Sequence, residues 1–167
     1  MDRPLGFEKL FNKDLLEAIG ILFITAAGAE TMAGLQLLRV LSHPRPLDLG
    51  LFPATAGMEM KVRLGIIRVR SAQIAPQCAA RISKITSKIQ DAFEHRNNIA
   101  HNMGLPEPTP SHVKLTILSF KGDGSLKERK TYNAKQIRLF SYLMEERLKA
   151  LNSAITEAGV PPIPEQF

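Results

Sequence analysis

Three side chains near the middle of the chain, Arg96, Asn97 and His101, could together act on an anionic group. Arginine keeps its positive charge at any ordinary pH and can contact a phosphate or a carboxylate through two parallel hydrogen bonds. Histidine titrates near neutral pH, so its imidazole can serve as a general acid or a general base. These residue types therefore suit either a phosphate ligand or an ion pair within the fold.

Arg96 falls inside the apolar face of a helix that we expect over residues 77–103. At about 100° per residue, the side chains on the same helix face are Ile82, Ile85, Ile89, Ala92, Phe93, Ala100 and Met103. A guanidinium held in such a face is costly unless an anion pairs with it. Glu30, embedded in an apolar helix expected over residues 14–42, is the best candidate within the chain.

Helical patterns account for most of the other segments. We expect an N-terminal arm over residues 1–13 and a second helix over 57–75, with a proline-bearing loop at 43–56 between the first two helices. A last helix over 134–158 would begin with a capping box at Asn133 and Gln136 and end at Gly159. Residues 160–167 would form a tail.

A different pattern precedes the last helix. Residues 112–120 alternate apolar and polar side chains, residues 121–125 have turn chemistry, and residues 126–133 follow as a second strand. The prediction is a mainly α fold, a helical bundle with a small β-hairpin before the last long helix. Its 167 residues suit a single domain.

Composition limits the setting of this domain. The net charge of +6 favours polyanionic partners such as RNA, DNA or an acidic protein. A single cysteine, Cys78, excludes an internal disulfide framework and fits a reducing compartment. The most apolar run, residues 18–29, is shorter than a bilayer-spanning helix. We therefore expect a cytoplasmic protein with no membrane partner.

The segment RNNIAH, residues 96–101, resembles the R-x4-6-H signature of the HEPN superfamily. A polar residue often follows the arginine in that family, and Asn97 matches this feature. The resemblance implies a helical bundle, usually a homodimer, with the two motifs meeting across the dimer interface. It also implies Arg96 and His101 as catalytic residues, Asn97 as a supporting residue and, through a looser match, Glu30 as a second one.

Many HEPN members resemble metal-independent endoribonucleases of toxin–antitoxin and other defence systems. Such cleavage requires a base for the ribose 2′-hydroxyl, an acid for the leaving oxygen and a cation for the charged transition state. One chain supplies one motif histidine, so two subunits would supply the base and the acid. The resemblance thus predicts an RNA-cleaving homodimer without a cofactor, with an antitoxin or another defence protein as an expected partner.

Two other interpretations remain open from the sequence. Some HEPN-like modules have lost activity and bind RNA, a nucleotide or a partner protein, and a bundle unrelated to HEPN could use Arg96 as a structural ion alone. Arg81, Lys84 and Lys88 lie off the apolar face and could bind an RNA backbone or form an ordinary solvated surface. The spacing of His, Cys and acidic residues predicts no metal site.

Overall fold

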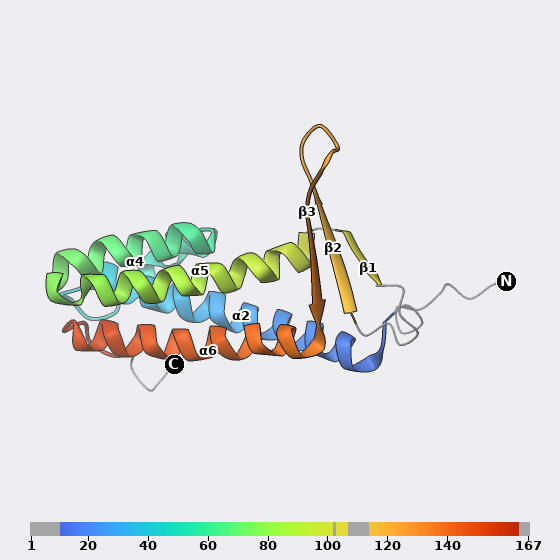
Figure 1. Ribbon diagram of the computed structural model, residues 1–167. Helices are drawn as coiled ribbons and strands as arrows, with labels where there is room; N and C mark the ends of the chain where they lie inside the picture. The colour runs from blue at the N-terminus through green and yellow to red at the C-terminus, as the bar shows by residue number, and fades with distance from the viewer. Residues whose placement is uncertain (1–10, 102, 107–113, 164–167) are drawn as a thin grey trace. The chain divides into compact units, whose positions relative to one another are not determined.

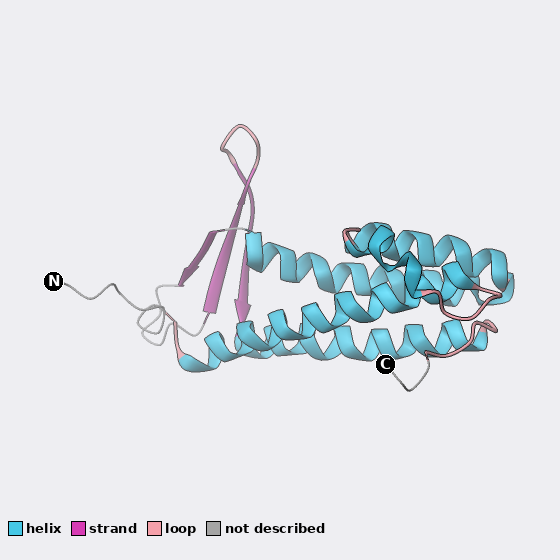
Figure 2. Cartoon of the chain, turned by 180° about the vertical axis from the view of Figure 1, so that it is seen from behind, coloured by secondary structure: helices cyan, strands magenta, loops and turns pink. Residues whose placement is uncertain are grey.

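The computed structural model of the protein describes residues 11–101, 103–106 and 114–163. The fold is mainly helical, with a small antiparallel sheet before the last long helix, as the sequence predicts (Figures 1 and 2). The chain divides into two compact units. We call residues 1–26 with 94–142 the sheet unit, and residues 27–93 with 143–167 the helical unit.

The helical unit is built from parts of four long helices. It contains the C-terminal part of α2 (Lys13–Ser42), all of α4 (Met60–Ile74), the N-terminal part of α5 (Ala79–His101) and the C-terminal part of α6 (Ala134–Glu157). Fully buried aliphatic side chains form its core, among them Leu37, Leu38, Leu64, Ile67, Ile82, Ile89, Met144 and Leu151. Burial of such side chains stabilises each by roughly 1.5–3 kcal/mol.

The connections in the helical unit contain more structure than predicted. The expected loop at 43–56 holds a 3₁₀ turn, η1 (Leu49–Leu51), and a short helix, α3 (Phe52–Ala56). Pro53 lies in the first turn of α3, where its missing N–H removes no helical hydrogen bond. A second 3₁₀ turn, η2 (Pro76–Cys78), separates α4 from α5. The proline content indicates the break between helices but did not reveal these short elements.

The sheet unit contains three strands in the order β1–β2–β3. The predicted hairpin is confirmed as β2 (Lys114–Phe120) and β3 (Leu126–Asn133). The third strand, β1 (Met103–Pro106), was predicted as the end of a helix followed by a loop, and that prediction is wrong. Met103 pairs with Leu118 of β2, so this backbone is used for the sheet and α5 ends at His101.

The two ends of α6 follow the sequence prediction closely. At its start, the backbone N–H of Gln136 donates to Oδ1 of Asn133, and the backbone N–H of Asn133 donates to Oε1 of Gln136, each over 2.9 Å. This is the reciprocal pattern of a capping box. At the other end, Gly159 adopts φ 87°, a left-handed conformation that side chains other than glycine rarely take. Both ends are therefore set by local sequence.

Helix α2 is longer than its apolar run suggested. Its 30 residues make it long and apolar enough to cross a membrane, judged by length and composition alone. Core helices of soluble proteins and signal sequences meet the same criterion. The apolar helix extends well beyond residues 18–29, and a cytoplasmic location stays a prediction.

Arg39 of α2 is an almost fully buried arginine of the helical unit, with 2% of its surface exposed to solvent. Its five donor positions are all used, within α2 and towards α6 and the residues that follow α6. Nη1 donates to the side chains of Gln36 and Asn152 over 2.6 and 2.7 Å. The remaining acceptors are the Thr156 hydroxyl and the carbonyl oxygens of Val160 and Pro161. Burial lowers the pKa of Arg39 from its usual value.

We expect Arg39→Met to destabilise the protein by about 2–4 kcal/mol, because it leaves several partly buried acceptors without a donor. The measurement is the free energy of unfolding in urea. Arg45→Met, at an exposed arginine of the same unit, is the control and should change that energy by less than about 0.5 kcal/mol. Equal small effects of both substitutions would contradict a stabilising role for the Arg39 network.

Candidate functional site

Arg96 lies in the last two turns of α5, within the sheet unit, and its guanidinium points inward. The guanidinium carbon lies 5.4 Å from the centroid of the Phe23 ring of α2. Nη1 donates to Oδ1 of Asn97 over 2.9 Å, and Nε is buried without a hydrogen-bond partner among the described residues. Arg96 is therefore half-buried, as its place on the apolar face predicts, and the next residue along the chain fixes its orientation.

His101 is the last residue of α5 and is exposed. Its position on the surface leaves the imidazole accessible to a ligand or to a second protein chain. The fixed cation and the titratable ring thus lie five residues apart on the final turns of one helix, where the backbone rises about 1.5 Å per residue.

His95, next to Arg96 on α5, packs against two aromatic rings. Its ring stacks on Phe140 of α6 with centroids 4.2 Å apart, and it meets the Tyr132 ring of β3 edge-on at 6.0 Å. Nδ1 of His95 lies 3.3 Å from the Tyr132 hydroxyl oxygen. Burial raises the pKa of Tyr132 above its usual value, so this phenol stays protonated at neutral pH. The cluster joins the end of α5 to β3 and α6.

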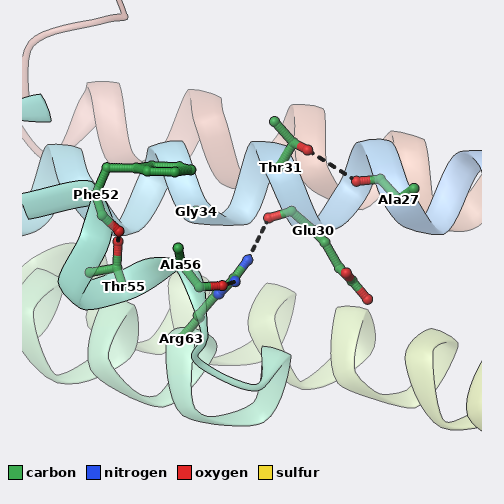
Figure 3. A pocket seen from close by; sticks show the side chains of 8 residues that line it. All are labelled: Ala27, Glu30, Thr31, Gly34, Phe52, Thr55, Ala56 and Arg63. Carbon is green, nitrogen blue, oxygen red and sulfur yellow. Dashed lines mark hydrogen bonds between the residues drawn. The ribbon is translucent and has the colours of Figure 1, made fainter.

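Glu30 belongs to the helical unit, whereas Arg96 belongs to the sheet unit. Within its own unit, Glu30 lines a cavity of about 240 Å³ between α2, α3 and α4, together with Phe52 and Arg63 (Figure 3). Its backbone carbonyl accepts a hydrogen bond of 2.8 Å from Nη1 of Arg63. The pairing of Glu30 with Arg96 stays a prediction, because the hydrogen bond of Glu30 to Arg63 is made by its backbone and not by its carboxylate.

The three basic residues predicted to contact RNA, Arg81, Lys84 and Lys88, are all exposed on α5 in the helical unit. Their side chains differ in what they contact. Arg81 forms an ion pair with Glu157 of α6, whereas the Lys84 and Lys88 side chains make no ion pair with a described residue. The two lysines are therefore the better candidates for contacts with a polyanion.

Neither the motif nor the cavity brings together a set of metal ligands. Among the described residues, no group of three or more His, Cys, Asp or Glu side chains is close enough to hold a metal ion.

Comparisons with models of known protein families, with curated proteins and with solved structures find no match for this chain.

Sequence reasoning did not find the cavity or the cluster around His95. Phe52 and Arg63 come from separate helices, and each looks ordinary in its own segment. Glu30, a polar residue within an apolar helix, gave the one signal in the sequence, and its pairing with Arg96 stays a prediction. Tertiary packing brings these residues together, so no spacing rule could have indicated them.

We expect Arg96→Met to cost about 1 kcal/mol or less in the free energy of unfolding. Methionine keeps an unbranched apolar stem against Phe23, and the lost contacts are one hydrogen bond to the exposed Asn97 and one cation–π interaction. Urea denaturation measures the change. A loss as large as that expected for Arg39→Met would favour the interpretation of Arg96 as a structural ion.

Proposed function

We propose that this protein is a metal-independent endoribonuclease of the HEPN type, which acts as a homodimer in a toxin or defence system. Arg96 and His101 from two subunits form the catalytic site, with Asn97 as the residue that orients the arginine. The observation that carries the proposal is the combination at the end of α5 of an oriented, half-buried guanidinium with an exposed imidazole.

The chemistry of RNA cleavage explains why this combination is useful. Arg96 has five donor positions, of which one is bonded to Asn97 and one, on Nε, is buried, so three remain for phosphate oxygens. Asn97 and Phe23 hold the guanidinium in place before a substrate binds, which lowers the cost of ordering it. A cation fixed in this way stabilises the negative charge on the non-bridging phosphate oxygens in the transition state.

The need for two proton transfers explains the dimer. Attack by the 2′-hydroxyl requires a base, and departure of the 5′-oxygen requires an acid. One chain contributes a single His101, and this side chain is exposed, so a second copy can bring its own imidazole to the same phosphate. In this arrangement one histidine begins neutral and the other begins protonated.

We expect His101→Ala to reduce RNA cleavage by about 10²–10⁴-fold, because a general acid or base of this kind is worth that much. The assay is cleavage of a mixed-sequence RNA by the purified protein in EDTA, with product ends analysed for 2′,3′-cyclic phosphate. His43→Ala is the control, since His43 lies in the helical unit and outside the motif. Cleavage by His101→Ala at the unaltered rate would refute the catalytic assignment.

Binding without cleavage would instead favour the second function considered from the sequence, a module that binds RNA or a partner protein. In that case the original protein and His101→Ala would bind RNA with the same affinity, and neither would cleave it. The same preparation thus separates the two functions.

We expect Lys84→Ala with Lys88→Ala to weaken RNA binding and to make it less sensitive to salt. Each lost phosphate contact should lower the magnitude of the slope of log K against log salt by about 0.7 for single-stranded RNA. Fluorescence anisotropy over a salt series measures this slope. The control is Lys149→Ala, because Lys149 is an exposed lysine of α6 that already pairs with Glu146. An unchanged slope in the double variant would exclude a role for these lysines.

A further inference from the structure

Strand β3 lies at an edge of the sheet, with β2 on one side and no described strand on the other (Figure 1). In an antiparallel edge strand, every second residue directs its N–H and C=O groups away from the sheet. Residues 126–131 make no backbone hydrogen bond to a described residue outside β2, and five of these six residues are exposed. This stretch of backbone is therefore open to pairing with another strand.

The two faces of β3 differ in charge, because side chains alternate between the faces along a strand. Glu128 and Lys130 share one face, and Nζ of Lys130 lies 3.0 Å from Oε2 of Glu128, so these two charges neutralise each other. Lys127 and Arg129 share the other face. Both are exposed, and neither forms an ion pair with a described residue. The open edge thus presents two uncompensated positive charges, two residues apart, on one face.

An exposed apolar pair lies next to these charges. Phe120 of β2 and Leu126 of β3 are partners in the sheet register near the hairpin turn, and each is about half exposed. Apolar surface of this kind stabilises a complex when another chain removes it from water. The edge therefore suits a partner strand that carries both apolar and charged side chains.

A second copy of β3 does not suit this edge. Directly opposite side chains on neighbouring strands have their Cβ atoms about 4.5–5.5 Å apart, where like charges destabilise the pair. Antiparallel pairing of β3 with itself, centred on any residue from 127 to 130, places two basic side chains opposite each other. Lysine on an edge strand opposes self-association in this way. The charge of the edge thus favours an occupant that is negatively charged.

We propose that the open edge of β3 binds an extended acidic segment of a partner protein by strand addition. Main-chain hydrogen bonds to residues 126–131 supply the affinity, and alternate side chains supply the selectivity. The segment has Asp or Glu at two positions separated by one residue, opposite Lys127 and Arg129. This surface goes beyond the proposed ribonuclease function, since neither Arg96 nor His101 takes part in it.

The probe is the acetylated and amidated peptide Thr-Val-Glu-Thr-Glu-Val-Thr, titrated into the full chain and followed by NMR. It should bind saturably at submillimolar concentration. Amide hydrogen exchange should slow at alternate residues within 126–131, because only every second amide points outward. The isomer Thr-Val-Glu-Glu-Thr-Val-Thr places one glutamate on each face, so it loses one charge pair and should bind about two- to fivefold more weakly.

Charge reversal tests the role of the two basic side chains. Lys127→Glu with Arg129→Glu should weaken binding of the alternating peptide at least about tenfold, because two attractive pairs become repulsive. The same variant should gain binding of Thr-Val-Lys-Thr-Lys-Val-Thr. The matched control is Lys13→Glu with Lys135→Glu, which makes the same change in net charge at two exposed lysines of the sheet unit outside the strand. It should change the affinity by less than about twofold.

Peptides that are N-methylated at their even or at their odd positions separate backbone pairing from charge attraction. The set of methyl groups that faces β3 should abolish binding, whereas the other set should preserve it. None of these measurements depends on RNA cleavage, so this proposal and the proposed function can fail independently.

The proposal is overturned if the alternating peptide does not bind saturably at millimolar concentration, or if both N-methylated peptides bind as tightly as the unmodified one. It is also overturned if Lys127→Glu with Arg129→Glu keeps full affinity while its circular dichroism spectrum is unchanged. Binding of mixed-sequence RNA that requires Lys127 and Arg129, with no slowed exchange within 126–131 when the peptide is added, would assign the edge to a nucleic acid instead.

Discussion

A guanidinium almost completely removed from water, that of Arg39, is the constraint on which the helical unit depends. An arginine keeps its proton at neutral pH even where burial lowers its pKa, so the fold must supply an acceptor for each of its donors. The acceptors come from Gln36 on α2, from Asn152 and Thr156 on α6, and from two carbonyl groups beyond α6. One side chain thereby fixes the C-terminal ends of two helices relative to each other.

No carboxylate takes part in this network, which shows that a buried arginine can be stabilised by neutral groups alone. The carbonyl oxygens near a helix C-terminus carry partial negative charge, and Arg39 lies where two such ends meet. Gly159 makes this arrangement possible, because its left-handed backbone turns the chain so that the carbonyls of Val160 and Pro161 face the guanidinium. The expectation that an inward-facing arginine needs an acidic partner was therefore too narrow.

The sequence predicted the elements whose signals are local. The helix over 134–158, its capping box and its terminal glycine depend on residues close in sequence, and so does the β2–β3 hairpin. The sequence did not predict β1, because pairing with β2 decides the state of that segment and pairing is not a local property. It also did not single out Arg39 as a buried residue. Arg39 sits in a strongly apolar segment and makes contacts more than 110 residues away, with Asn152, Thr156, Val160 and Pro161.

Three arginines show how structural and ligand-binding uses of one side chain can be told apart. Arg39 makes five hydrogen bonds to the protein, Arg63 makes two, and Arg96 makes one, each from five donor positions among the described residues. The first is complete without a ligand. The other two are held in a fixed orientation but keep unused donors, which is the condition for binding an anion or an acceptor edge with little loss of side-chain entropy. Recognition of a phosphate by Arg96, as proposed, would then depend on this principle. There, the fold uses a minority of the donors to orient the guanidinium and leaves others for the ligand.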